Sequence, residues 1–358
     1  HKCGNRTDNC YFQRSQMIIT DIRLETRSLP LKTPFITAKR RLDVLKYYTV
    51  DIMTDNGLRG TGSCSPTPVI TGDTDGSIIY AINDWFAPRL IGREVTPELL
   101  PYIKKSLYAN TSPKAALDIA VHDLLAKQAN TKLVTYLGGS SDYVDTDVTV
   151  SIGNSKKVAS DIARAIDDGF RSLKIKLGRG RDEDLGTIRE IAAIVPPGIR
   201  VRFDANQAWG REDSVYIISH AAELPLQIDL FEQPVDADDI DGMSYVTANT
   251  PIDILADESV FDSADAIRVI KAKAADLINI KLMKCGGIYE AKKIYEAAAQ
   301  AGIGCMVGCM MEGPESVLAA AQFAAATGIT LCDLDAPFLC SYIPEGTGKF
   351  EKGRIYFD

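Results

Sequence analysis

The distribution of apolar and polar positions changes character partway along the chain. Residues 18–62 alternate in the manner of β-strands, and the Asp55-Asn56-Gly57 turn separates two such runs. Residues 77–138 carry apolar positions at a helical period and end at Leu137-Gly138-Gly139. We therefore expect an α+β region over residues 17–140.

From about residue 144 the pattern becomes a repeat of a short apolar strand followed by an amphipathic helix. Residues 185–194, for example, place Leu or Ile at every third position along one helix face. Helices between consecutive short strands force parallel pairing, so the repeat predicts a parallel α/β structure. Eight strands are expected, at residues 148–152, 172–177, 201–204, 228–232, 254–257, 277–282, 304–308 and 330–333.

Polar residues close most of these strands at a regular spacing. They are Lys176, Asp204, Glu232, Asp257, Lys281 and Asp333. Successive members lie 24 to 28 residues apart, and the last step of 52 residues spans two units. A doubly wound sheet gathers its site at one switch point, whereas a barrel brings every strand end to one mouth. The spacing therefore favours a barrel.

These patterns define the expected domain organisation. Residues 141–337 should form a parallel α/β barrel, and residues 17–140 a separate α+β region. Residues 1–16 resemble a degraded protease-cleavage tag and are excluded from the fold prediction.

Composition and charge narrow the class of protein. The 358 residues are 46% hydrophobic and 25% charged, which is ordinary for a soluble globular protein. Forty basic and 48 acidic residues give a net charge of −8, which argues against nucleic acid as a partner. No apolar run approaches the roughly 20 residues of a membrane span, and no signal pattern is visible. Eight cysteines without zinc-type spacing agree with the reducing cytoplasm.

The order of charges at the strand ends points to a metal-assisted proton transfer. Asp204, Glu232 and Asp257 end three successive strands, and three carboxylates in one place repel one another unless a cation holds them. Their hard oxygen ligands suit Mg²⁺. Lys176 and Lys281 flank them, so one lysine could remove a proton next to a carboxylate and the other return it on the opposite face. Each motif alone could be a turn acid or a helix cap, but their common order at strand ends favours a site.

Five segments in this order resemble the enolase superfamily, and in particular its muconate-lactonizing subgroup. They are Leu173–Leu177, Arg202–Gln207, Phe231–Pro234, Ala256–Ser259 and Ile278–Lys281. The resemblance implies that residues 141–337 form a modified TIM barrel of the (β/α)7β type, which would be the catalytic domain. It implies that residues 17–140, together with the tail 338–358, form an α+β capping domain. The barrel would hold Mg²⁺ through Asp204, Glu232 and Asp257. The resemblance also implies that Lys176 and Lys281 are the acid–base pair and that Lys174 helps to neutralise the substrate carboxylate. Asn206 and Glu258 would support the metal ligands.

The last strand narrows the resemblance to one branch. Asp333-Leu334-Asp335 is similar to the dipeptide epimerases, whose two carboxylates hold the free ammonium of the substrate. The three histidines, at positions 1, 122 and 220, lie at no expected strand end, which disfavours the sugar-acid dehydratase branches. The resemblance implies inversion of the C-terminal residue of a dipeptide such as L-Ala-L-Glu, by two-base 1,1-proton transfer through an enediolate.

Four further residues fall at substrate-contact positions of that family. Arg40 matches the arginine that binds the distal glutamate carboxylate in epimerases of the L-Ala-D/L-Glu type, although a solvated basic loop is the alternative. Thr146, Cys309 and Met311 match other contact positions, and packing is the alternative for the last two. Gly313-Pro314-Glu315 departs from the family pattern near the N-terminal residue of the substrate.

Several functions stay open at this stage. An epimerase for hydrophobic or cationic dipeptides would use the same machinery. A muconate cycloisomerase, an N-acylamino-acid racemase or an o-succinylbenzoate synthase would not need a substrate with a free amine. A catalytically silent metal-binding scaffold is the alternative outside the enzymes. The subgroup also implies a homo-oligomer, for which the sequence offers no readable interface.

Overall fold

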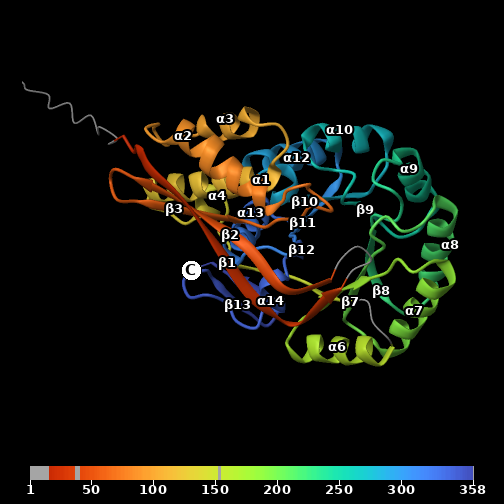
Figure 1. Ribbon diagram of the computed structural model, residues 1–358. Helices are drawn as coiled ribbons and strands as arrows, with labels where there is room; N and C mark the ends of the chain where they lie inside the picture. Colours follow the sequence, from red (N-terminus) through yellow and green to blue (C-terminus); the bar gives the residue numbers. More distant parts are fainter. Residues whose placement is uncertain (1–15, 37–40, 152–154, 358) are drawn as a thin grey trace, which may run out of the picture.

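The computed structural model describes residues 16–36, 41–151 and 155–357, and Figure 1 shows an antiparallel sheet beside a ring of strands and helices. The sheet has the order β1-β2-β3, with bounds Ile19–Ile36, Arg41–Thr54 and Arg59–Cys64. The tight turn between β2 and β3 places Gly57 at φ +83°, a conformation that favours glycine. This sheet is the expected β part of the N-terminal region.

Helices cover one face of this sheet. They are α1 (Asp75–Tyr80), the π-helix η1 (Ala81–Phe86), α2 (Ala87–Leu90), α3 (Leu99–Ser106), α4 (Thr111–Gln128) and α5 (Leu133–Tyr136). The central helix α4 is buried almost all round. Gly60 and Gly62 of β3 lie directly against its backbone at Ala120 and Ala116, where a Cβ would overlap carbonyl oxygens. Glycine at both positions therefore allows the sheet and α4 to pack closely.

The strand repeat forms a parallel barrel, which confirms the expected fold class. Its strand order is β12-β11-β10-β9-β8-β7-β6-β5. The bounds are β5 Val148–Val150, β6 Ser172–Lys176, β7 Arg200–Asp204, β8 Gln227–Glu232, β9 Ile254–Ala256, β10 Leu277–Lys281, β11 Gly304–Gly308 and β12 Leu331–Asp333. Every pair of neighbouring strands is parallel.

The helices between these strands lie on the outside of the barrel, as Figure 1 shows for α6 to α10. Their bounds are α6 Ser155–Asp167, α7 Arg181–Ile194, α8 Arg211–Ala221, α9 Ile240–Asn249, α10 Ser263–Ala272, α11 Leu282–Cys285, α12 Ile288–Ala301 and α13 Pro314–Thr327. Asp118 of α4 accepts a 2.6 Å hydrogen bond from the backbone N–H of Ile288 at the start of α12. The N-terminal region is thereby fixed to the barrel.

The two end strands, β5 and β12, meet through contacts around Thr146. The Asp147 N–H donates to Cys332 O at 3.2 Å, and the Leu334 N–H donates to Thr146 Oγ1 at 2.8 Å. Inside the barrel, Asp147 forms a buried 2.7 Å ion pair with Arg202. These contacts close the ring and leave its carboxyl-end mouth facing the N-terminal sheet.

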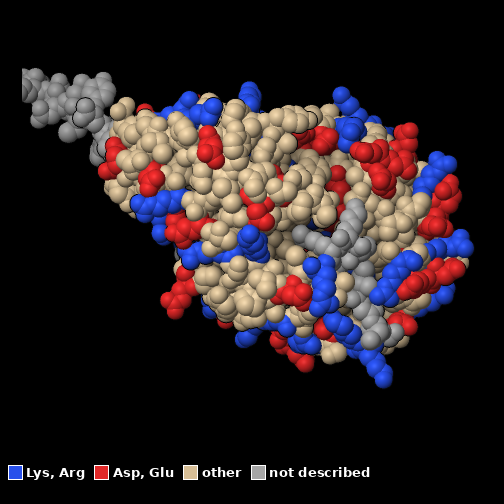
Figure 2. All heavy atoms as spheres, in the orientation of Figure 1, with Lys and Arg blue, Asp and Glu red and all other residues tan. Residues whose placement is uncertain are grey.

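The chain ends in a short helix and a small sheet beside the barrel. Helix α14 spans Ala336–Leu339, and strands β13 (Lys349–Glu351) and β14 (Arg354–Tyr356) pair with β4 (Tyr143–Asp145). Figure 2 shows acidic and basic side chains interspersed over one face of the molecule. Within the described residues, no helix has the length and apolar character to cross a membrane.

Candidate active site at the barrel mouth

Strand register brings the three predicted metal ligands together. Asp204 of β7 is paired in register with Glu232 of β8, and Asp257 follows directly after the neighbouring strand β9. All three are almost completely buried, at 0%, 0% and 2% exposure. Because parallel strands end at one edge, residues at or directly after the strand ends converge there.

Two lysines of β6 compensate the charge of these carboxylates. Lys174 Nζ lies 2.6 Å from Glu232 Oε2 and 3.1 Å from Asp204 Oδ2. Lys176 Nζ donates to Asp204 Oδ2 at 2.6 Å and to Asn206 Oδ1 at 3.1 Å. Burial opposes the charge of Lys174, but the surrounding carboxylates outweigh it and hold its pKa well above the usual range.

Two further lysines approach from β10 and α11. Lys281 Nζ donates to Asp257 Oδ2 at 2.7 Å, and Lys284 Nζ to Asp257 Oδ1 at 2.6 Å. Burial works against ionisation of Asp257, yet these two ammonium groups hold its pKa well below the usual range. Burial likewise opposes the charge of Lys281, and Asp257 overcomes it, so the pKa of Lys281 is raised. Lys176 and Lys281 thus lie on opposite flanks of the carboxylates.

Glu232 differs from Asp204 and Asp257 in the direction of its pKa shift. Burial, followed by the nearby Asp204 carboxylate, raises the pKa of Glu232 to about 8. Its Oε1 accepts a 3.1 Å hydrogen bond from Asn279 Nδ2, a side chain that is itself fully buried. A divalent cation beside Glu232 would favour its ionised form.

The backbone directly after these acids adopts an unusual conformation. Asn206, Gln207 and Gln233 have φ values of +46°, +70° and +38°. Left-handed backbone at residues other than glycine is uncommon and concentrates at functional sites. Gln233 makes use of it, since its Oε1 accepts the backbone N–H groups of Asp257 and Ser259 at 2.9 and 3.2 Å. One strained glutamine thereby fixes the loop that carries the third acid.

The last strand contributes acids whose charge is less fully compensated. Asp333 Oδ2 accepts a 2.7 Å hydrogen bond from Lys174 Nζ, and although burial opposes it, this lowers the pKa of Asp333. Asp335 is bound by the backbone N–H of Thr149 at 2.6 Å. Burial and then the Asp333 carboxylate raise the pKa of Asp335 to about 6. A cationic ligand beside Asp333 and Asp335 would offset the repulsion between their carboxylates.

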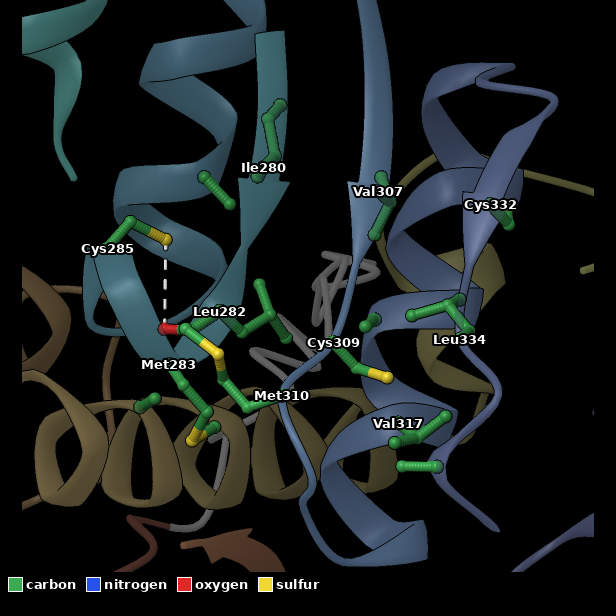
Figure 3. Packing of buried hydrophobic residues seen from close by; sticks show 14 of the residues in the cluster. Ile280, Leu282, Met283, Cys285, Val307, Cys309, Met310, Val317, Cys332 and Leu334 are labelled. Atoms are coloured by element: carbon green, nitrogen blue, oxygen red, sulfur yellow. Dashed lines mark hydrogen bonds between the residues drawn. The ribbon is translucent and has the colours of Figure 1, made fainter. Parts of the chain in front are cut away.

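A cleft above the carboxylates collects most of the predicted residues. The N-terminal region lines it with three apolar side chains, Phe35, Val69 and Ile70. The barrel lines it with Thr149, Lys174, Lys176, Asn206, Asp257, Glu258, Lys281, Cys309, Met310, Met311, Asp333 and Asp335. In Figure 3, Cys309 and Met310 follow β11 among buried apolar side chains, which gives the cleft a firm apolar wall. Asp204 and Glu232 lie buried at its base.

One predicted contact residue among those described is not part of this lining. Thr146 is buried, but its Oγ1 closes the barrel instead of facing the cleft. The reason is strand parity, since Asp147 and Thr149 share one face of the chain and Thr146 lies on the other. Arg40 lies outside the described residues. The sequence interpretation missed Thr149, Asn279 and Lys284, of which Asn279 stood in a recognised motif without an assigned role.

The carboxylate set suits a hard divalent cation, but ammonium groups share its space. In the described part of the chain, no group of three Asp, Glu, His or Cys side chains is arranged closely enough to hold a metal ion as it stands. Lys174 Nζ lies between Asp204 and Glu232 and takes up the charge there. The three buried carboxylates on adjacent strand ends have the oxygen donors that Mg²⁺ prefers. A cation bound there would take over part of the role of the Lys174 ammonium.

Comparison with known proteins gives a consistent picture across the chain. Residues 19–138 match the mandelate racemase/muconate lactonizing enzyme N-terminal domain, and residues 157–355 match the enolase C-terminal domain-like family. An L-Ala-D/L-Glu epimerase from Clostridium acetobutylicum is 41% identical over 328 residues, covering 91% of this chain and 92% of that protein.

Solved structures agree with this match. A substrate-liganded complex of the L-Ala-D/L-Glu epimerase from Bacillus subtilis superposes with a TM-score of 0.92 at 38% identity, covering 96% of this chain and 97% of that one. A dipeptide epimerase from Enterococcus faecalis, complexed with Mg and the dipeptide L-Leu-L-Tyr, gives a TM-score of 0.91 at 37% identity, covering 96% and 98%. The similarity includes both the barrel and the N-terminal region.

Proposed function

The chain belongs to the mandelate racemase/muconate lactonizing enzyme family of the enolase superfamily, and from this premise we propose that it is a Mg²⁺-dependent dipeptide epimerase. The observation that carries the proposal is the placement of Lys176 and Lys281 on opposite flanks of three buried carboxylates. Inversion at a carbon needs one group that removes a proton and another that returns it from the opposite face. A binding scaffold has no need of two such lysines.

Each group at the mouth then has a role in the reaction. Asp204, Glu232 and Asp257 would hold Mg²⁺, which would supply positive charge to the substrate carboxylate while the α-carbon is deprotonated. One lysine, which a cation held by the carboxylates would shift towards its neutral form, accepts the α-proton of the C-terminal residue. The other, as an ammonium, donates a proton to the opposite face, so the proton count balances. Lys174 would add positive charge next to the substrate carboxylate.

The acids of the last strand supply the preference for a free amine. Asp335 is buried at 5% exposure and Asp333 at 3%, and both line the cleft. A substrate ammonium placed there makes charge-assisted hydrogen bonds with them. This supports a dipeptide with a free N-terminus over an N-acylamino acid or a muconate, neither of which has a free α-ammonium group.

The nature of the C-terminal residue divides two candidate activities. L-Ala-D/L-Glu epimerisation is supported by the similarity to epimerases of that name and depends on a cation such as Arg40. Epimerisation of dipeptides with an apolar second residue is supported by Phe35, Val69 and Ile70 on the described wall of the cleft. If the protein is an L-Ala-D/L-Glu epimerase, Arg40→Ala should lower its activity on L-Ala-L-Glu and leave its activity on L-Ala-L-Leu unchanged. If it prefers an apolar second residue, this selective loss should not occur.

Proton NMR in D₂O tests the proposal directly. The protein is incubated with Mg²⁺ and a dipeptide library that includes L-Ala-L-Glu, L-Ala-L-Leu and their N-acetyl derivatives. We expect the C-terminal α-proton signal to disappear and the diastereomer to appear, and a chelator should stop both changes. Exchange of the N-acetyl compounds alone would indicate a racemase instead, and no exchange with any compound would refute an epimerase.

Two coarser properties complete the proposal. Six free cysteines occur among the described residues, and their reduced state suits a cytoplasmic enzyme. Homo-oligomerisation is proposed from family membership alone. Cell fractionation and light scattering of the purified protein test these two points.

A further inference from the structure

Asp184 holds an unusually large number of hydrogen-bond donors outside the cleft. It lies in the first turn of α7 and is 1% exposed. Its two carboxylate oxygens accept the backbone N–H groups of Gly178, Arg179 and Gly180 at 3.0 to 3.1 Å. They also accept the indole Nε1–H of Trp209 at 2.8 Å. Four donors on one buried carboxylate make a strong, charge-assisted anchor.

The donors belong to two loops, one that follows β6 directly after Lys176 and one that follows the neighbouring strand β7. The first loop starts one residue after Lys176, and Gly178 and Gly180 adopt φ values of +116° and +115° within it. The second loop, after β7, contains both Trp209 and Asn206, whose Oδ1 accepts the Lys176 ammonium at 3.1 Å. Asp184 therefore joins the chain that carries Lys176 to the chain that carries its hydrogen-bond partner.

We propose that Asp184 is a positioning residue for Lys176, which sets the direction of the Lys176 side chain without touching the substrate. This inference rests on the proposed epimerase function. The four donors all come from the β6 and β7 loops, whereas Lys281 stands on β10 and is held by Asp257. Loss of the anchor should consequently disturb one base and leave the other in place.

Asp184→Asn is the variant that exposes this asymmetry. The amide keeps the size of the side chain but replaces one acceptor by an NH₂ group, which then faces N–H donors. Two loops lose their common anchor, and a displacement of about 1 Å at a catalytic group can cost on the order of 100-fold in rate. We expect α-proton exchange to fall about 10- to 100-fold for one epimer and less than threefold for the other.

The affected epimer can be identified independently. Lys176→Ala removes one base outright, so the epimer whose exchange it abolishes is the one deprotonated by Lys176. Asp182→Asn is the matched control, because it makes the same chemical change in the same helical turn on a side chain that is 89% exposed. Trp209→Phe removes a single donor and should produce the same asymmetry at smaller size.

The readout is deuterium incorporation into the L- and D-epimers measured separately, with kcat and KM for each. Selective loss for the Lys176 epimer in Asp184→Asn supports the inference. Equal loss of exchange for both epimers, or no loss, overturns it. If Asp184→Asn does not fold, the same comparison of the two epimers is made with Trp209→Phe. Absence of exchange in the unmodified protein would instead refute the epimerase function on which the inference rests.

Discussion

The two sides of the barrel mouth handle buried charge in different ways. On the lysine side, at the ends of β6 to β10, the three proposed metal ligands lie close to ammonium groups, as Asp204 does to Lys176 at 2.6 Å and Asp257 to Lys281 at 2.7 Å. On the acidic side, Asp335 and Glu312 accept hydrogen bonds from backbone N–H or hydroxyl groups. Asp333 stands at the border, because it is paired with Lys174.

This difference shows in the pKa values. The pKa of Asp257 is held well below its usual range despite burial, whereas burial raises those of Asp335 and Glu312 to about 6 and about 8. Glu232 is the exception on the lysine side, because burial and the Asp204 carboxylate raise its pKa to about 8. Under the proposed function, the lysine side would supply the proton transfer. Asp335 would bind a cation from outside, which would favour its ionised form. Chemistry and recognition would then lie on opposite sides of one mouth.

Removal of either lysine base should cause the largest loss in the rate of epimerisation. Lys281→Ala or Lys176→Ala should slow epimerisation about 10²–10⁴-fold, since that is the usual contribution of a positioned acid–base group. Each variant should still exchange the α-proton of one epimer, because the other lysine stays in place. The measurement is NMR of both epimers in D₂O.

Lys292→Ala is the matched control for both variants, as its side chain is 67% exposed. It should epimerise at the unmodified rate. Wild-type rates in either Lys176→Ala or Lys281→Ala would show that the two-base mechanism is wrong.

A change on the acidic side should alter selectivity more than chemistry. Asp335→Asn removes the negative charge and keeps an oxygen for the Thr149 N–H. Truncating one partner of a buried ion pair costs about 2 kcal/mol or more. We expect kcat/KM for a free dipeptide to fall about 30-fold, with little change for the slow N-acetyl analogue.

Asp142→Asn serves as the control, because the Asp142 side chain is 81% exposed. It should leave the ratio of the two kcat/KM values unchanged. An equal loss on both substrates in Asp335→Asn would place Asp335 in the architecture of the mouth and not in ammonium recognition.

Lys284 offers a smaller test of the balance on the lysine side. Its ammonium donates to Asp257 Oδ1 at 2.6 Å and to Asn279 O at 3.1 Å, so it fixes the orientation of a proposed metal ligand. Groups that orient metal ligands typically contribute about 10- to 100-fold in affinity or activity. Lys284→Met should raise the Mg²⁺ concentration for half-maximal activity by that factor. A Mg²⁺ titration identical to that of Lys292→Met would contradict the role.

The barrel and its acids could be predicted because strand geometry alone determines them. Regular spacing of polar strand ends indicated eight parallel strands, and parallel strands bring their ends to one mouth whatever the loops do. Asp204, Glu232 and Asp257 therefore meet as expected. It was harder to predict which face of the chain a given side chain occupies. Side chains alternate between the two faces, so Thr146 and Thr149, three positions apart, lie on opposite faces.

Residues outside the strand ends gave no comparable signal. Lys284 belongs to the one-turn helix α11, and its contact with Asp257 depends on how that turn folds back over the mouth. Asp184 lies in a helix whose acidic first turn also contains the exposed Asp182 and Glu183, so composition could not single it out. The interpretation of Arg40 stays a prediction, because it lies outside the described residues.

The last prediction concerns Glu312, which should make stability depend on pH and leave the proposed chemistry alone. It is 1% exposed and accepts hydrogen bonds from Met310 N–H at 3.2 Å and Ser316 Oγ–H at 3.1 Å. Burial raises its pKa from 4.5 to about 8, so the folded protein keeps a proton that the unfolded chain releases. Between these two pH values the free energy of unfolding must fall as pH rises, by at most about 1.4 kcal/mol per pH unit from this group.

Glu312→Gln isolates that contribution, because an amide does not titrate in this range. Urea unfolding of both proteins at pH 5, 6, 7 and 8 gives the difference in their free energies of unfolding, in which the other titrating groups cancel. We expect this difference to shift in favour of Glu312→Gln with each step, whereas the exposed Glu345→Gln should run parallel to the unmodified protein. A constant difference for Glu312→Gln would mean that Glu312 is already ionised in the fold, and that the acidic side has a cation partner after all.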